Sequence, residues 1–202
     1  MSLYKVIIAV FVASCLMTGF ACAQSASSTS VQSETPSFST DVTALEATLK
    51  VRLDQFETIF VSENISKLSN FTPPKVLNQI LSSANVTRAQ LDAQVDQVWK
   101  MTLQFVEIGE FEIDNTARSV EFLDNGRPYK ILPTTTKMKL KANKSEIVSR
   151  SETLALVADG EWYIVRLDEP AQVKIFRAEY PDFDNVEVME PVMLMDGKEV
   201  TR

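Results

Sequence analysis

The sequence predicts an α+β fold class, with N-terminal helices packed on a curved antiparallel β-meander of about four to six strands. Apolar residues recur at steps of three or four between residues 42 and 102, which is the period of an amphipathic helix. From residue 106 onward apolar and polar residues alternate, which is the period of a strand. We therefore expect a single domain over residues 41–183, with helices on one face of the sheet.

The N-terminus has the pattern of a secretory signal peptide. A positively charged start precedes an apolar run over residues 6–20, and small residues follow it. We expect residues 1–23 to be a signal peptide that is cleaved between Ala23 and Gln24. A disordered, Ser/Thr-rich leader would follow over residues 24–40. The apolar run is shorter than the ~20 residues that cross a hydrocarbon core, so the mature form is expected to lack a transmembrane span.

A second N-terminal pattern indicates a different processing route. Residues 12–15, Val-Ala-Ser-Cys, resemble a bacterial lipobox, in which acylated Cys15 would anchor the mature protein to a membrane. We favour cleavage after Ala23 because the apolar run continues to Phe20, beyond the lipobox. The favoured destination is a bacterial periplasm, because eukaryotic secreted domains more often carry disulfides. The eukaryotic alternative stays open because the chain has Asn-x-Ser/Thr sequons at Asn64, Asn70, Asn85 and Asn143.

Three helices are expected in the first half of the domain. The first covers about five turns over residues 42–60 and carries apolar residues along one face. The second is short, and the third ends near Thr102. Each helix has a start signal of a known kind. These signals are a Thr43–Glu46 capping box, the prolines Pro73 and Pro74, and a Thr87–Gln90 capping box.

The first strands are expected to contain a bulge and a tight hairpin. Alternation slips by one residue at Gly109, which predicts a β-bulge. The dipeptide Asn125-Gly126 suits a two-residue type I′ turn, because both residues tolerate a positive φ. This turn would place Phe122 opposite Tyr129. The ladder should end or bulge where Pro133, which has no N–H, would have to donate.

The later strands should form a longer hairpin and a closing hairpin. Thr134, Thr136, Met138 and Leu140 would share one face of a long strand, with a lysine stripe on the other. The turn Asp159-Gly160 would place Val157 opposite Trp162. Both faces of this closing hairpin are apolar, so it should lie in the middle of the sheet, with helices covering one face and something else shielding the other.

The chain should finish with a short helix and a tail. Asp168 is the expected cap of this helix, with Pro170 in its first turn and Phe176 and Tyr180 buried. Residues 184–202 would form a C-terminal tail or an extra edge strand.

In this order of helices and strands, the chain resembles the exported members of the nuclear-transport-factor-2-like (cystatin-like) superfamily. The residues that carry the resemblance are the long helix around Leu49 to Phe60 and the hairpin from Leu154 to Val165, in which Asp-Gly precedes Trp-Tyr-Ile-Val. The resemblance implies long bent strands that curl around an N-terminal helix and leave a conical pocket. It also implies either of two functions, because the superfamily contains enzymes as well as non-catalytic binders.

Composition removes several classes of chemistry. The chain has no histidine, and its two cysteines, Cys15 and Cys22, lie in the predicted signal peptide. Triads based on His, thiolate nucleophiles, metal sites and disulfides are therefore not expected, and neither is a cofactor. The formal net charge of −7 argues against a nucleic-acid partner, whose phosphates require a surplus of Lys and Arg. With only five glycines, a Gly-rich phosphate loop is not expected either.

The function that these observations favour is that of an exported, non-catalytic binding or accessory protein for an apolar small molecule or an envelope protein. The expected ligand-binding residues are Trp99, Phe122, Tyr129 and Tyr163. A homodimer through the open sheet face is a further expectation. The alternative is an isomerase-like or hydratase-like enzyme that uses Asp and Tyr, since some superfamily enzymes do. Its candidate residues are Tyr129, Tyr163, Asp114 and Asp124.

The lysine stripe also has two interpretations. It consists of Lys137, Lys139, Lys141 and Lys144, with Arg150 beyond it. It would touch an anionic surface if it were functional. We favour a solvated strand face that discourages aggregation through the sheet edge.

Overall fold

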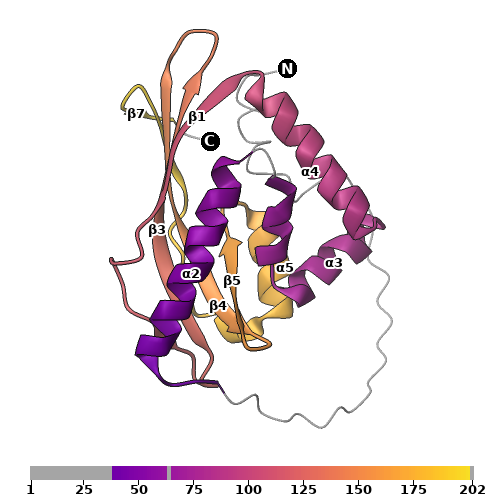
Figure 1. The fold of residues 1–202 in the computed structure, drawn as a ribbon, viewed down its shortest axis with the longest axis vertical. Coiled ribbons are helices and arrows are strands. Elements are labelled where there is room, and N and C mark those ends of the chain that lie inside the picture. The colour runs from indigo at the N-terminus through magenta and orange to yellow at the C-terminus, as the bar shows by residue number, and fades with distance from the viewer. Residues whose placement is uncertain (1–37, 63–64, 201–202) are drawn as a thin grey trace.

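The computed structural model describes residues 38–62 and 65–200. The predicted signal peptide, its cleavage site at Ala23 and Gln24, Cys15 and most of the predicted leader lie outside these residues. Within the described residues the chain forms four α-helices, two 3₁₀-helices and seven strands, which confirms the α+β class. The strands form one open antiparallel sheet, α2 lies along one face of it, and α4 stands at its side (Figure 1).

The helices begin close to where their start signals predict. They are α2 (Val42–Val61), η1 (Ile65–Phe71), α3 (Pro74–Ala84), α4 (Arg88–Leu103), α5 (Pro170–Glu179) and η2 (Pro181–Phe183). The Thr87–Gln90 capping box of α4 is confirmed. The predicted box of α2 is wrong, because the Asp41 carboxylate accepts from the backbone N–H groups of Thr43 and Ala44. Glu46 instead accepts a hydrogen bond from Lys130, which is buried in the sheet.

The sheet has more strands than the four to six that we expected. They are β1 (Val106–Ile113), β2 (Glu121–Phe122), β3 (Pro128–Leu140), β4 (Glu146–Ala158), β5 (Glu161–Arg166), β6 (Val192–Met195) and β7 (Lys198–Glu199). The main order is β1-β3-β4-β6-β7, while β2 pairs with the start of β3 and β5 with the end of β4. The extra strands come largely from the C-terminal tail, where β6 pairs with β4 as an added strand.

The bulge and the closing hairpin have the predicted geometry. The register between β1 and β3 shifts at Gly109, where an added Cβ would lie 3.3 Å from the carbonyl oxygen of Lys137. At the closing turn Asp159 and Gly160 have φ values of 51° and 80°, as a type I′ turn requires. Val157 pairs with Trp162 as expected.

The first hairpin is shifted by one residue from its predicted register. Phe122 pairs with Pro128, and Glu121 pairs with Tyr129. Gly126 alone in this loop has a positive φ, of 78°, and the Leu123 N–H donates to the Arg127 carbonyl, so the loop contains three residues. This is a three-residue connection with its glycine in the left-handed region, which is the next most common hairpin geometry.

Helices cover both faces of the sheet, which corrects the expected one-sided packing. Ala155, Val157, Trp162 and Ile164 belong to the apolar cluster that includes α2. Leu154, Leu156, Tyr163 and Val165 belong to a second cluster on the other face, with residues of α3, α5 and η2. Of the two strands of the closing hairpin, β4 lies inside the sheet, whereas β5 pairs with β4 alone and forms an edge. Helices α5 and η2 therefore cover these apolar residues of the second face, which we had expected to be open to a dimer partner.

The cap predicted for the last helix is also wrong. The N-cap residue of α5 is Glu169. Asp168 forms an ion pair with Arg166 instead, with 2.8 Å between the guanidinium nitrogen and the carboxylate oxygen. Phe176 and Tyr180 are buried as predicted.

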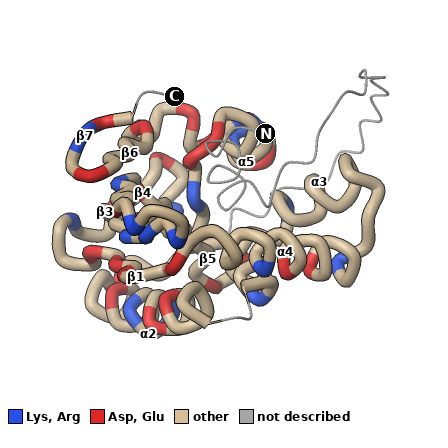
Figure 2. The backbone as a smooth tube through the Cα atoms, turned by 90° about the horizontal axis from the view of Figure 1, so that it is seen from above, with Lys and Arg blue, Asp and Glu red and all other residues tan. Residues whose placement is uncertain are grey.

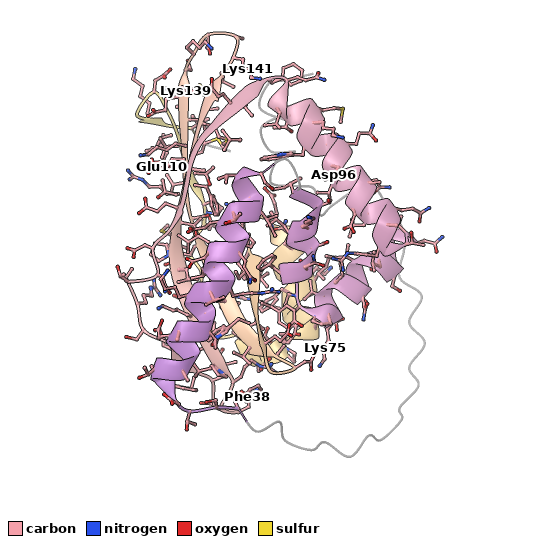
Figure 3. The ribbon with its side chains drawn as sticks, in the orientation of Figure 1. Phe38, Lys75, Asp96, Glu110, Lys139 and Lys141 are labelled. Atoms are coloured by element: carbon pink, nitrogen blue, oxygen red, sulfur yellow. The ribbon has the colours of Figure 1, made fainter. Side chains whose placement is uncertain are left out.

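The lysine stripe lies beside acidic residues of the neighbouring strand. Lys137 and Lys139 of β3 pair with Glu110 and Glu107 of β1, and the Lys137–Glu110 ion pair measures 2.6 Å. Figure 2 shows basic and acidic positions close together along β1 and β3, and Figure 3 labels Glu110 and Lys139 on this part of the sheet. This arrangement favours the interpretation as a solvated strand face.

Candidate functional site

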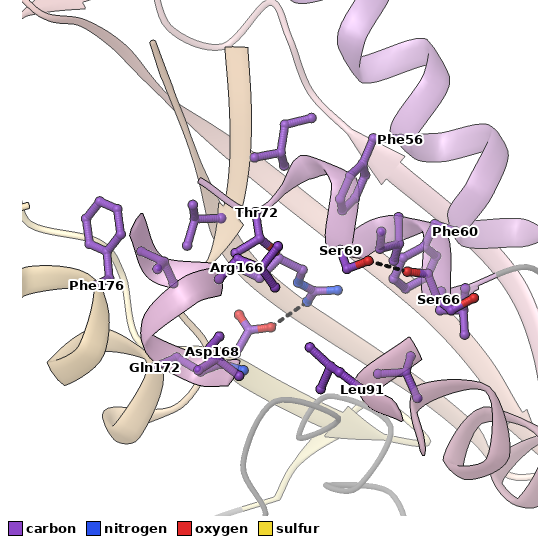
Figure 4. A pocket seen from close by; sticks show the side chains of 18 of the residues that line it. Phe56, Phe60, Ser66, Ser69, Thr72, Leu91, Arg166, Asp168, Gln172 and Phe176 are labelled. Carbon is purple, nitrogen blue, oxygen red and sulfur yellow. Dashed lines mark hydrogen bonds and ion pairs between the residues drawn. The ribbon is translucent and has the colours of Figure 1, made fainter. Parts of the chain in front are cut away.

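A cavity of about 190 Å³ lies between the edge strand β5 and the helices beside it. We call it the interlayer cavity, and Figure 4 shows it from close by. Strand β5 and helix α5 form one wall, and η1, α3 and α4 form the other, with the end of α2 closing the space between them. Its most prominent apolar lining residues are Phe56, Phe60, Leu68, Ile80, Leu91, Val95, Trp99, Ile164, Ile175 and Phe176.

Aromatic rings form a rigid corner of this cavity. The centroids of Phe60 and Trp99 lie 6.1 Å apart in an edge-to-face arrangement. Phe60 also stacks on Phe111 of β1, which ties the corner to the sheet. The Trp99 side chain is buried, yet its Nε1–H has no hydrogen-bond partner among the described residues. A buried donor without a partner has lost its hydrogen bonds to water. A ligand that accepts a hydrogen bond from this N–H would therefore bind more tightly.

The polar feature of the cavity is the Arg166–Asp168 ion pair (Figure 4). The Arg166 side chain is 14% exposed and that of Asp168 is 5% exposed. Arg166 also donates to the Ser151 hydroxyl over 3.2 Å, and its guanidinium lies 5.9 Å from the Phe60 ring centroid. Burial lowers the pKa of Arg166, and the neighbouring Asp168 carboxylate opposes that shift. The ion pair thus places a polar group with little net charge in a mainly apolar space.

A hydrogen-bond network holds the η1 wall against α4. Arg88 donates to the Asp92 carboxylate over 3.2 Å and to the Asn70 side-chain oxygen over 2.7 Å. The Ser69 hydroxyl lies 2.9 Å from Asp92, and the Ser66 N–H donates to Asp96. The short 3₁₀-helix is therefore fixed by side chains of α4, which keeps the wall of the cavity in place.

The four residues that we expected to bind a ligand lie in separate places. Trp99 lines the interlayer cavity. Phe122 is 39% exposed on β2. The Tyr129 hydroxyl donates to Glu121 over 2.7 Å, and burial together with Glu121 raises the pKa of Tyr129 to about 12. Tyr163 is buried in the cluster on the α5 side of the sheet.

The acids named for the alternative enzyme lie outside the cavity too. Asp114 accepts hydrogen bonds from the Thr116 hydroxyl and backbone N–H, and these bonds lower the pKa of its exposed carboxyl. Asp124 is exposed in the first hairpin loop.

The Arg166–Asp168 ion pair was not among the predicted features, although the sequence contains a signal for it. Arg166 directly follows the run Trp-Tyr-Ile-Val over residues 162–165, and Asp168 follows Arg166 by two residues, a spacing that places two side chains on the same side of an extended chain. A charged pair of this kind after an apolar strand can be identified from sequence alone. Its position beside Trp99 and Phe60 cannot, because those residues come from distant helices.

The described residues hold no group of three or more His, Cys, Asp or Glu side chains that could bind a metal ion. None of the helices in the described part of the chain is both long and apolar enough to cross a membrane. Comparisons with protein-family models, with curated proteins and with solved structures gave no match. The geometry of the cavity is therefore the basis for proposing a function.

Proposed function

We propose that this protein is an exported, non-catalytic binding protein that holds a small, mainly apolar molecule in the interlayer cavity. The observation that carries the proposal is the combination of aromatic and aliphatic walls with one buried ion pair and the buried Trp99 N–H. Ligand pockets typically combine apolar walls with a few polar groups that orient the ligand.

The volume of the cavity limits the size of the ligand. An apolar cavity of about 150 Å³ is known to admit benzene. A space of about 190 Å³ therefore suits one ring with a small substituent, on the order of ten non-hydrogen atoms. Larger lipids and most drug-sized molecules are too big, since their pockets are typically about 300 Å³ or more.

The charge of the cavity limits the type of polar group. Arg166 already has Asp168 as its counter-charge, so a charged ligand would bring an uncompensated charge into a buried site. A neutral acceptor such as a carbonyl or hydroxyl oxygen can instead accept from the Trp99 N–H. We therefore expect a neutral ligand with one acceptor.

Acetophenone, with toluene and benzoate for comparison, tests this proposal. The indole N–H signals of the two tryptophans are followed by NMR during titration, and Trp99→Phe assigns them. Acetophenone should shift the Trp99 signal saturably and bind about three- to tenfold more tightly than toluene, because of one added hydrogen bond. Benzoate should bind most weakly.

A matched pair of variants locates the site. Val95→Phe fills the interlayer cavity from α4 and should abolish the acetophenone shift. Val51→Phe makes the same change at a position that is 58% exposed and should leave binding unchanged. The proposal fails if no probe shifts the Trp99 signal, or if Val95→Phe binds acetophenone as the wild type does.

The proposals for export and for the fold family rest on the sequence pattern and on the arrangement of α2. Mass spectrometry of the exported protein should find Gln24 at its N-terminus, and an acylated Cys15 would instead support lipid anchoring. The long helix α2 against the 13-residue strands β3 and β4 supports a relation to the nuclear-transport-factor-2-like superfamily. No observation of this structure favours the Asp–Tyr enzyme.

A further inference from the structure

A second and larger cavity opens around the β4–β5 turn, at the end of β5 away from Arg166. Its volume is about 700 Å³, and we call it the turn cleft. Phe38 and Lys75, two of its lining residues, lie at the same end of the molecule in Figure 3. The lining of the turn cleft also includes Arg52, Arg127, Asp159, Glu161, Trp162 and Tyr180.

Two cations in the turn cleft lack a carboxylate partner. Arg52 donates to the carbonyl oxygens of Trp162 and Asn70 over 3.1 and 2.8 Å, and its guanidinium lies 4.0 Å from the Phe71 ring centroid. The Lys75 ammonium lies 5.7 Å from the Tyr180 ring centroid. No ion pair of either side chain occurs within the described ranges 38–62 and 65–200. Both positive charges thus lie beside neutral groups.

Two carboxylates in the same cleft also lack an ion-pair partner within those ranges. Asp159 belongs to the tight turn, and Glu161 begins β5. The third cation, Arg127, is different because Asp182 pairs with it over 2.8 Å. The cleft therefore offers two uncompensated positive charges and two uncompensated negative charges.

Two aromatic side chains, which we call the aromatic floor, line the same cleft. Trp162 and Tyr180 are 5% and 3% exposed. The Trp162 indole N–H donates to the Thr48 hydroxyl over 3.1 Å, which fixes the ring against α2. The rigid floor can accept an apolar or aromatic side chain with little loss of conformational entropy.

We infer that the turn cleft binds a zwitterion with an apolar side chain, which is the chemistry of a free amino acid or a short peptide. Its carboxylate would meet Arg52 and Lys75, its ammonium group would meet Asp159 and Glu161, and its side chain would lie on Trp162 and Tyr180. An anion without an ammonium group leaves the two carboxylates unmatched and close to its own charge, and a cation without a carboxylate leaves the two cations unmatched in the same way. This inference does not depend on the ligand of the interlayer cavity.

Three probes with the same phenyl ring separate these cases by calorimetric titration of the full chain. Phenylalanine carries both charges, 3-phenylpropionate only the negative one, and phenethylamine only the positive one. Phenylalanine should bind at least about tenfold more tightly than either analogue, since each charge is matched. Equal binding of 3-phenylpropionate, or no binding of phenylalanine, overturns the inference. The dipeptide phenylalanylphenylalanine then distinguishes the two sources, because tighter binding than phenylalanine indicates a peptide and weaker binding a free amino acid.

Two surface variants test the charged ends separately. Lys75→Gln should weaken phenylalanine binding but strengthen phenethylamine binding, whereas Glu161→Gln should weaken phenylalanine binding but strengthen 3-phenylpropionate binding, because each change removes a charge that repels the analogue. Both side chains are exposed, so the fold should tolerate the changes. Lys198→Gln, on the distant strand β7, is the matched control and should change nothing. Unchanged phenylalanine binding in both cleft variants would contradict the inference.

Discussion

Lys130 shows how this chain stabilises a charge inside its sheet. Its side chain is 1% exposed, and all three hydrogens of its ammonium group have acceptors. Two are the carboxylate oxygens of Glu46, at 2.9 and 2.7 Å, and the third is the Asn115 carbonyl at 2.8 Å. Glu46 also accepts from the Val120 N–H. This group of contacts ties α2 to the loop that connects β1 and β2.

Replacing Glu46 should be far more costly than replacing an exposed acid of the same helix. Glu46→Ala leaves the Lys130 charge buried without a counter-charge, and we expect a loss of about 3 kcal/mol in the free energy of unfolding. Asp54→Ala removes an exposed pair with Lys50 and should cost less than about 0.5 kcal/mol. Urea denaturation measures both. Similar losses in the two variants would contradict this account, and a Glu46→Leu/Lys130→Met double variant should recover most of the loss.

Tyr180 should make the stability depend on pH in the alkaline range. Burial raises its pKa to about 12, with a smaller opposing effect of Arg127. The unfolded chain, in which the pKa is about 10, therefore loses this proton first, and stability falls between pH 10 and 12. Tyr180→Phe keeps the ring that stacks on Phe176 but removes the ionisation. Its unfolding free energy relative to wild type should rise from pH 9 to 12, and parallel pH profiles would refute the assignment.

At the scale of elements, periodicity and turn chemistry predicted much of the fold. The apolar spacing located α2, and the two-residue Asp159-Gly160 turn fixed the β4–β5 register. The predictions were wrong where a residue can adopt either of two local structures. Asn125-Gly126 suits a two-residue loop as well as a three-residue one, and the side-chain contacts of Asn125 with Arg127 and Asp182 are not visible in a local pattern. Asp168 was in a position to cap α5, but its carboxylate forms an ion pair with Arg166 instead.

The three-residue loop predicts which of its residues is sensitive to substitution. Gly126 has a φ of 78° with open space around it, so the cost of Gly126→Ala comes from the backbone alone. We expect a loss of about 1 kcal/mol in unfolding free energy. Asp124→Ala in the same loop changes an exposed residue with a negative φ and should cost less than about 0.5 kcal/mol. A type I′ turn would require a positive φ at Asn125 as well. A loss for Asp124→Ala as large as that for Gly126→Ala would contradict this account.

At the scale of the whole molecule, one sheet separates two apolar clusters and leaves its β5 edge beside a cavity. The α2 side contains both tryptophans, Trp99 and Trp162. The α5 side contains Phe176 and Tyr180. The interlayer cavity touches both sides, because Phe60 and Phe176 both line it. Such a site depends on contacts between segments far apart in the chain, which is why the sequence indicated Trp99 but not its neighbours.

Because β4 and β5 contribute side chains to both clusters, the two sides should unfold together. Phe176→Ala removes a ring that is 1% exposed on the α5 side and should cost about 3–5 kcal/mol. Both tryptophans report from the opposite side, so their fluorescence should follow the change only if the sheet couples the two clusters. We expect the urea midpoint from fluorescence to fall as far as the midpoint from circular dichroism, with coincident curves. A fluorescence midpoint that stays at the wild-type value would mean that the α5 side unfolds by itself.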